Sequence, residues 1–328
     1  MSKVKIIGVG SYLPSTIITN NSLSEVVDTT DEWIVQRTGI KHRRFASDEE
    51  ATSDLCVFAA EKAIVDAKIE KNAIDLLLVA TATPDQLVAC TSAVVQHKLG
   101  LNKTAGYEIA SACSGFVNSF LTAWQFLCAG SYKTALVIGG ETLSKFVNIK
   151  DRTTCIIFGD GAGAVVMQSY EGEGISDILS GSMGMDGSGT DKLLMPAGGS
   201  RMPTSIHTVE KKLHFIHMQG RDIYKFAVRK MAELIQQELV ANQWTPEDVN
   251  MVIPHQVNLR ILESAAKMAE IPMDRMLINI NKYGNTSSAS IPIALNEAVC
   301  RGKVKRGSKI IFVAFGAGLT WSSASLIW

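Results

Sequence analysis

The chain has 328 residues, of which 46% are hydrophobic and 20% are charged, a composition that supports a sizeable core and excludes a disordered protein. Thirty-two basic and thirty-two acidic residues cancel, so the charge signature of a general nucleic-acid-binding protein is missing. Apolar runs fall short of the ~18 residues of a membrane-spanning helix, and the N-terminus lacks a signal peptide, so we expect a cytoplasmic protein without membrane insertion.

Short apolar segments alternate with longer amphipathic ones along the chain, which predicts strands alternating with helices. The predicted strands are Val4–Val9, Leu76–Thr81, Thr134–Ile138, Gly163–Met167, Met251–Pro254, Met276–Ile280 and Lys309–Ala314. The predicted helices are Ser53–Ala67, Ser92–Leu99, Ser114–Ala129, Gly220–Ala241, Asn258–Met268 and Ser287–Arg301. This alternation indicates an α/β protein with mostly parallel sheets that are covered on both faces.

The two halves of the chain repeat the same order of elements. A buried strand with a polar end occurs at Asp75–Thr83 and again at Val249–Gln256. This order indicates a duplicated α/β unit, with one half at residues 1–172 and the other at residues 173–328. Within the second half, Gly181–His217 is rich in Gly and Pro, and we expect an irregular lid or cap there.

The sequence contains no pattern typical of a metal or nucleotide site. The six cysteines are scattered, as in a chain of reduced thiols, and His214 and His217 lack a second ligand pair for zinc. The glycines at Gly8–Gly10 lack the third glycine of the dinucleotide fingerprint, and Gly159–Gly163 lacks the Lys-Ser/Thr of a phosphate-binding loop. We interpret both glycine runs as tight turns between closely packed backbones.

Three segments carry residues suited to catalysis. Cys113 stands where an apolar stretch turns into an apolar helix, and because a helix N-terminus favours an anion, we expect a lowered thiol pKa. His255 follows a buried strand, at the carboxyl end where α/β sheets place ligands, and Asn285 stands at a polar helix start. Each residue alone also fits a structural role, as a packed cysteine, a structural histidine or a helix cap. Their joint order favours a catalytic set.

With these motifs in this order, the chain resembles β-ketoacyl-[acyl-carrier-protein] synthase III, the family of condensing enzymes that initiates bacterial fatty acid synthesis, within the thiolase-fold superfamily. The resemblance runs nearly end to end and implies a duplicated thiolase-like fold, with two mixed sheets and helices in layers (α-β-α-β-α). It is carried by Thr30–Ile40 (TDEWIVQRTGI), Ala112–Phe116 (ACSGF), Phe158–Ala164 (FGDGAGA), Pro254–Arg260 (PHQVNLR), Gly284–Ser287 (GNTS) and Phe315–Trp321 (FGAGLTW).

The resemblance implies a ping-pong condensation of acyl-CoA with malonyl-acyl carrier protein on Cys113, His255 and Asn285. Cys113 would carry the acyl group, while His255 and Asn285 would donate hydrogen bonds to the malonyl carbonyl oxygen. The backbone N–H groups of Cys113 and Ala317 would form the oxyanion hole. Acyl-CoA is a substrate here, so the resemblance implies no cofactor and no metal, and it implies a homodimer.

The resemblance also implies residues for the remote parts of the substrates. CoA would contact Trp33, Arg37, Arg152 and Asn258. The acidic carrier protein would dock on a basic patch, for which the candidates are Gln256, Arg260, Lys225 and Arg229, with Lys267 beside them.

Val88 is the candidate residue of the acyl pocket. By the same resemblance, it stands in a loop that carries Phe in many relatives and that in those relatives reaches across the dimer into the partner's acyl pocket. Because Val is smaller than Phe, we expect room for a longer or branched primer than acetyl.

Several other functions compete with condensation. A secondary-metabolic acyltransferase of the same fold would use Cys113 and His255, but Asn285 favours condensation. A thiolase would use a further cysteine as base, and the sequence has none beyond Cys300. A Cys-His-Asn hydrolase of the papain type would carry its own signature around the cysteine, and a non-catalytic binding protein would not need all three residues.

Overall fold

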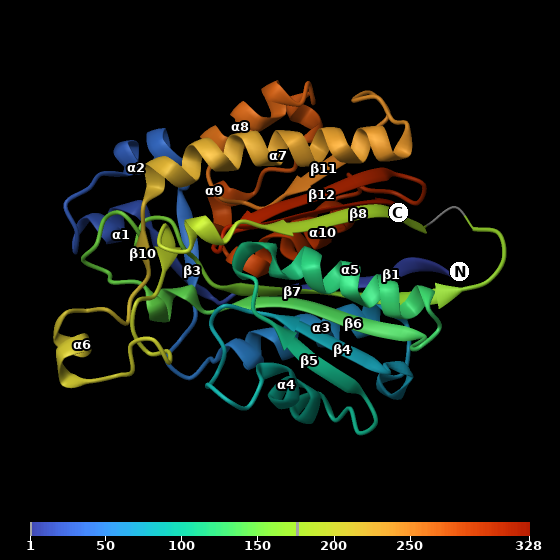
Figure 1. Cartoon of the computed structure of the whole chain (residues 1–328), viewed down its shortest axis with the longest axis horizontal. Helices are drawn as coiled ribbons and strands as arrows, with labels where there is room; N and C mark the ends of the chain where they lie inside the picture. The colour runs from blue at the N-terminus through green and yellow to red at the C-terminus, as the bar shows by residue number, and fades with distance from the viewer. Residues whose placement is uncertain (1, 175–176) are drawn as a thin grey trace.

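The computed structural model describes residues 2–174 and 177–328, which fold into five layers in the order α-β-α-β-α (Figure 1). The first sheet contains β1 (Lys3–Tyr12), β4 (Leu76–Ala80), β5 (Ala105–Ile109), β6 (Thr134–Glu141) and β7 (Gly161–Tyr170), in the order β1-β7-β6-β4-β5. The second contains β8 (Asp177–Met185), β11 (Met251–Pro254), β12 (Lys309–Gly316) and β13 (Thr320–Ile327), in the order β11-β12-β13-β8. The layered α/β fold that the resemblance implies is confirmed.

Both sheets mix parallel and antiparallel pairs. In the first sheet β4 pairs in parallel with β5 and β6, whereas β7 runs antiparallel to β1 and β6. In the second sheet β12 is parallel to β11 and antiparallel to β13, which is joined to it by a short turn. The expectation of mostly parallel sheets is therefore wrong, because a short turn can join only antiparallel neighbours.

Helices cover each sheet and fill the space between the two. The outer helices are α3 (Thr52–Ala67) and α4 (Thr91–Leu99) on the first sheet, and α7 (Gly220–Asn242) and α8 (Leu259–Met268) on the second. The middle layer contains α5 (Gly115–Cys128) and α10 (Ser290–Cys300), which are largely buried since they face a sheet on both sides. Within the described residues, no helix is both long and apolar enough to cross a membrane.

Short helices and strand pairs lie outside the two sheets and their covering helices. They are helices α1 (Asn20–Ser24), α2 (Asp31–Thr38), α6 (Ile206–Glu210) and α9 (Ile280–Tyr283), and the strand pairs β2 (Thr16–Thr19) with β3 (His42–Phe45) and β9 (Leu193–Leu194) with β10 (His217–Met218). Figure 1 shows α6 on an excursion that projects from the body. Of the segment predicted to be irregular, residues 181–185 belong to β8, so that part of the prediction is wrong.

The predicted strand Met276–Ile280 is also wrong. Met276 makes a single parallel bridge to Val252, and Ile280 already begins α9. Gln256 explains the break, because its side-chain oxygen accepts the N–H groups of Asn279 and Ile280, which a continued strand would need for its ladder.

The two halves of the sequence share the middle layer. Strands of the first sheet come from residues 3–170 and those of the second from 177–327, yet α10 packs on β1 and β7 of the first half. The division at residue 172 stays a prediction.

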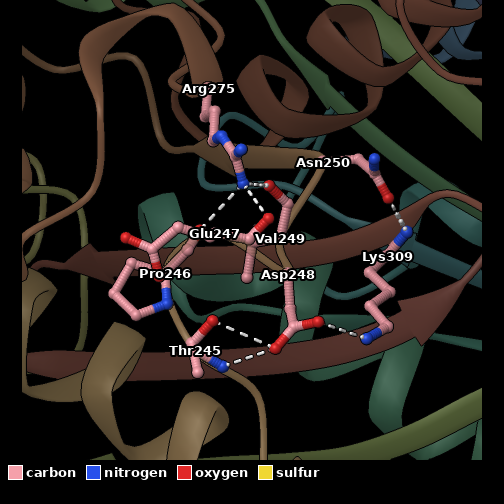
Figure 2. A network of polar contacts seen from close by, with 8 residues as sticks. All are labelled: Thr245, Pro246, Glu247, Asp248, Val249, Asn250, Arg275 and Lys309. Atoms are coloured by element: carbon pink, nitrogen blue, oxygen red, sulfur yellow. Dashed lines mark hydrogen bonds and ion pairs between the residues drawn. The ribbon is translucent and has the colours of Figure 1, made fainter.

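The segment 245–250 fixes the start of β11, the strand that leads to His255. Figure 2 shows Arg275 donating to three backbone carbonyl oxygens of this segment, those of Pro246, Glu247 and Val249. Lys309 at the start of β12 binds the same segment, with its Nζ atom 3.1 Å from Oδ1 of Asp248. The segment is thus tied to its neighbours by two cations.

Candidate active site

Cys113 lies in a sharp turn between strand β5 and helix α5. Residues 112–114 form one 3₁₀ turn, in which Ala112 has the left-handed φ of +44°. The turn packs tightly, since a Cβ added to Gly115 would lie 3.1 Å from the Cβ of Ala80. Cys113 is only 7% exposed. The structure therefore places a buried thiol at a helix start, where the sequence predicts it.

The expected lowering of the Cys113 pKa is wrong. Burial raises the pKa of this thiol to about 12, and the charge of Glu141 acts in the same direction, while hydrogen bonding by Ser287 opposes both. Taking the thiolate out of water outweighs the hydrogen bond from Ser287 that favours it. Cys113 is thus a neutral thiol at neutral pH, and its proton must leave as the sulfur attacks.

His255 enters the site from the end of β11. Its backbone N–H donates to the carbonyl of Val313 at 2.8 Å, which continues the pairing of β11 with β12. Its Nδ1 lies 2.8 Å from Oγ of Ser290, and its Nε2 is buried without a hydrogen-bond partner among the described residues. Burial lowers the pKa of His255 to about 3, so the imidazole is neutral.

Asn285 is held on both sides of its backbone. Its N–H donates to the carbonyl of Ile157 at 2.9 Å, and its own carbonyl accepts the N–H of Gly159 at 3.0 Å. The side-chain Oδ1 accepts the N–H of Ser287 at 2.8 Å. The carboxamide is therefore oriented by its oxygen, which leaves the Nδ2 hydrogens as donors for another group.

Two cavities meet at Cys113. The apolar cavity, about 130 Å³, is lined by Ala82, Thr83, Ala112, Cys113, Leu143, Phe146, Phe158, Leu193, Leu194, Met195, Ile216, Ser287 and Ala317. The His–Asn cavity, about 150 Å³, is lined by Cys113, Ile157, Phe158, Leu193, Met218, Gly220, Ile223, Tyr224, His255, Val257, Asn258, Ile261, Asn285, Phe315, Gly316 and Leu319. The structure thus brings the three predicted catalytic residues to one space, and Cys113 also borders the apolar cavity.

The end of β12 lies directly against the backbone of Cys113. A Cβ added to Gly316 would lie 2.8 Å from the backbone nitrogen of Cys113 and 3.2 Å from that of Ser114. Ala317 follows and lines the apolar cavity beside Cys113. The two backbone segments predicted to form an oxyanion hole are therefore neighbours.

Three of the predicted CoA residues form one cluster. The guanidinium groups of Arg37 and Arg152 lie 4.6 and 4.7 Å from the ring centre of Trp33, which stands on α2. The fourth, Asn258, lines the His–Asn cavity, and its Nδ2 donates to the carbonyl of Arg37 at 3.0 Å. The cluster is therefore linked through Asn258 to the cavity of the catalytic residues.

The predicted docking residues divide into two groups. Lys225 and Arg229 of α7 and Arg260 and Lys267 of α8 are exposed, on helices that pack side by side. Gln256 is wrong as a docking residue, because it is 1% exposed. Its amide donates to two carbonyl oxygens at 2.9 Å and accepts two backbone N–H groups, so all of its polar capacity is used inside the fold.

Val88 lines neither cavity of the single chain. Its side chain is completely exposed, it has a φ of +83°, and the neighbouring Leu87 is 72% exposed. A left-handed backbone conformation is unusual for a β-branched residue such as valine, and here the side chain is also exposed to solvent. The role of Val88 in a partner subunit's acyl pocket stays a prediction.

Glu141 is a site residue that the sequence analysis missed. It is fully buried at the end of β6, and its carboxylate accepts hydrogen bonds from Thr81, Ala82, Thr83 and Ser288. Ala82 and Thr83 line the apolar cavity, and Ser288 lies three residues after Asn285. Glu141 therefore ties a wall of that cavity to the turn that holds Asn285. A lone carboxylate at the end of an apolar strand was the available signal.

Comparison with known proteins points to one family. The family model described as 3-oxoacyl-[acyl-carrier-protein (ACP)] synthase III matches residues 107–187, and that described as its C-terminal part matches residues 239–328. The β-ketoacyl-[acyl-carrier-protein] synthase III of Caldanaerobacter subterraneus subsp. tengcongensis is 50% identical over 98% of this chain and 97% of its own length. The protein of the same name from Clostridioides difficile is 48% identical over 100% of this chain and 99% of its own.

The fold is similar to that of a solved structure as well. The crystal structure of 3-oxoacyl-[acyl-carrier-protein] synthase III from Aquifex aeolicus matches with a TM-score of 0.91 and 42% sequence identity. The match covers 99% of this chain and 100% of that one. Sequence and fold therefore agree along the whole length.

Proposed function

This chain belongs to the β-ketoacyl-[acyl-carrier-protein] synthase III family, and from its site we propose how it performs the condensation that initiates fatty acid synthesis. It is an acyltransferase, and its substrates in the proposal are an acyl-CoA primer and malonyl-acyl carrier protein. The observation that carries the proposal is that Cys113 lines both an apolar cavity and a second cavity, which is also lined by His255 and Asn285.

In the first half-reaction the sulfur of Cys113 attacks the carbonyl carbon of the acyl-CoA thioester. A carbon–sulfur bond to Cys113 forms, the bond to CoA breaks, and the thiol proton ends on the departing CoA sulfur. The apolar cavity then holds the acyl chain. The backbone N–H groups of Cys113 and Ala317 stabilise the oxyanion, and each donor of this kind is worth about 2.7–4 kcal/mol in the transition state.

In the second half-reaction malonyl-acyl carrier protein enters the His–Asn cavity. Its carboxylate leaves as CO₂, and the electron pair of the broken bond forms an enolate on the thioester. His255 and Asn285 donate hydrogen bonds to the enolate oxygen, a role that suits Asn because a carboxamide cannot act as a base. The enolate carbon attacks the acyl carbon, the bond from that carbon to the sulfur of Cys113 breaks, and the released thiolate takes up a proton from water.

Residues away from Cys113 would bind the parts of the two substrates that do not react. Trp33, with Arg37 and Arg152, would hold the adenine and phosphate end of CoA, and Asn258 would contact the pantetheine arm. The exposed basic residues of α7 and α8 would bind the acidic carrier protein, a complementarity that speeds encounter more than it adds affinity. No cofactor enters the proposal, because CoA leaves as a product.

The choice of primer depends on the residues that border the apolar cavity. We propose a homodimer in which Val88 of one subunit borders the apolar cavity of the other and admits primers longer or more branched than acetyl. Turnover of acetyl-CoA against branched and medium-chain acyl-CoAs tests this. A strict preference for acetyl would contradict it.

The test of the main proposal separates the two half-reactions. The protein is incubated with radiolabelled acyl-CoA, and malonyl-acyl carrier protein is added afterwards. Cys113→Ala should abolish the label on the protein, whereas His255→Ala and Asn285→Ala should acquire the label and form little 3-oxoacyl product.

Cys300→Ala is the matched control, since Cys300 is an exposed free thiol that lines neither cavity. It should label and condense as the unmodified protein does. Equal labelling of Cys113→Ala would refute the assigned nucleophile, and release of free acid without condensation would favour a hydrolase.

A further inference from the structure

Ser290 contacts the Nδ1 atom of His255, the ring nitrogen other than the unpartnered Nε2. The Oγ of Ser290, in the first residue of α10, lies 2.8 Å from Nδ1 of His255. His255 is 0% and Ser290 2% exposed, so water does not compete for this hydrogen bond. The direction of the hydrogen bond decides which ring nitrogen carries the proton of the neutral imidazole.

A second contact indicates this direction. The backbone N–H of Gln256 points to the same Oγ at 3.4 Å, so the oxygen of Ser290 accepts from one neighbour. The hydroxyl hydrogen then needs an acceptor, and Nδ1 of His255 is the one that the described residues offer. A nitrogen that accepts has no proton, so the imidazole proton lies on Nε2.

The surroundings hold this arrangement rigidly. The side chain of Gln256 is anchored by four backbone groups, with donor–acceptor distances of 2.9–3.1 Å, so the N–H beside Ser290 is fixed as well. The Nε2 atom of His255 is buried and unpartnered among the described residues, and His255 lines the cavity that also contains Cys113 and Asn285.

We propose that Ser290 is a positioning residue that fixes His255 as the Nε2–H tautomer, so that the imidazole is a hydrogen-bond donor to the malonyl thioester and not the base for Cys113. The proposal rests on the proposed function and deepens it. It requires the proton of Cys113 to leave with the CoA sulfur. It also explains Gln256, a residue of the same motif, as a support for Ser290.

The first test measures the tautomer directly. In protein labelled with ¹⁵N at histidine, the ring nitrogens of His255 are assigned by comparison with His255→Gln, and their shifts tell which one carries the proton. We expect a protonated Nε2 and an unprotonated Nδ1 at pH 7. A proton on Nδ1 would overturn the proposal.

The second test measures the two half-reactions of Ser290→Ala. Acylation by acyl-CoA should stay within about twofold, while kcat of the condensation should fall about 10-fold with KM for malonyl-acyl carrier protein little changed, the smallest loss typical of removing the hydrogen-bond partner that orients a metal-binding histidine. Ser290→Thr, which keeps the hydroxyl, should restore most of the rate. A well-folded Ser290→Ala with full condensation activity would overturn the proposal, as would equal losses in both half-reactions.

Thr208→Val is the matched control. It removes a hydroxyl that lies 3.0 Å from Nε2 of His214. This hydroxyl–histidine contact resembles that of Ser290 with His255, but neither Thr208 nor His214 lines either cavity, so the substitution should change neither half-reaction. Failure of the unmodified protein to acylate or to condense would refute the proposed function itself. If it does both and Ser290→Ala also does both normally, only the role of Ser290 is refuted.

Discussion

The chemistry of Cys113 is set by opposing effects on a single thiol. Hydrogen bonding by Ser287 favours the anion, but burial disfavours it more strongly and the nearby carboxylate of Glu141 acts in the same direction as burial, which raises the thiol pKa to about 12. A neutral thiol resists alkylation and oxidation between turnovers, since the thiolate is the reactive form. Its activation then depends on the bound thioester and the oxyanion donors.

Glu141→Gln should lower the pKa of Cys113, because it removes a negative charge and keeps nearly the same shape. The rate of alkylation by iodoacetamide, followed against pH, should rise at lower pH in the variant than in the unmodified protein. Glu108→Gln, which changes a carboxylate whose contact is the N–H of Thr91, is the control. Identical alkylation profiles for Glu141→Gln and the unmodified protein would contradict the assigned effect of this charge.

At the scale of elements, the site depends on how closely the end of β12 approaches the turn at Cys113. Gly316→Ala should strongly reduce acylation, because its Cβ would lie 2.8 Å from the backbone nitrogen of Cys113 and displace an oxyanion donor. The loss should reach about 100-fold, measured as acyl transfer from acyl-CoA in single turnover.

Gly187→Ala is the control for this prediction, since its Cβ would meet no atom within 4 Å. Circular dichroism should show both variants folded. Full acylation by Gly316→Ala would mean that the turn is less constrained than the packing indicates.

The segment before β11 gives a prediction about stability. Arg275→Ala leaves three carbonyl oxygens of the segment 245–250 without their charged donor, and hydrogen bonds to charged groups are the stronger kind (Figure 2). The free energy of unfolding should fall by about 2–3 kcal/mol in a urea titration. Lys71→Ala, which removes an exposed ion pair, should change it by less than about 1 kcal/mol. Equal effects of the two substitutions would contradict the anchoring role.

The sequence patterns predicted these elements unevenly. Helices α3, α4, α7 and α8 were found within one or two residues, since long periodic segments carry a clear signal. Strands β8 and β13 were missed, because the serines and glycines of β8 and the buried serines of β13 break the apolar pattern. Met276–Ile280 looked like a strand because periodicity cannot show that Gln256, about 20 residues away, takes its backbone N–H groups.

At the scale of the whole molecule, the site forms where the two halves of the sequence meet. Cys113 comes from the first half, and His255 and Asn285 come from the second, so their motifs were recognisable but their common cavity was not. Burial was the property hardest to infer, since it depends on both halves at once. Because of burial, Gln256 supports the fold from inside and does not face a carrier protein, and the Cys113 thiol is neutral.

Burial of His255 also couples the site to global stability. Its pKa is about 3 in the fold and about 6.5 in the unfolded chain, so the unfolded chain binds a proton that the fold excludes as pH falls below about 6.5. This residue should therefore cost about 2 kcal/mol of stability between pH 7.5 and pH 5. His255→Gln should lose correspondingly less over that interval, measured by urea unfolding at both pH values. An equal loss in both proteins would contradict the neutral, buried state.

The most direct measurement is peptide-mapping mass spectrometry of the protein after mixing with an acyl-CoA. One acyl group should appear on the peptide that carries Cys113, and it should disappear when malonyl-acyl carrier protein is added, as 3-oxoacyl-acyl carrier protein and CO₂ form. An acyl group on another cysteine, or one on Cys113 that persists in the presence of malonyl-acyl carrier protein, would contradict the assignment of Cys113 as the nucleophile of the condensation.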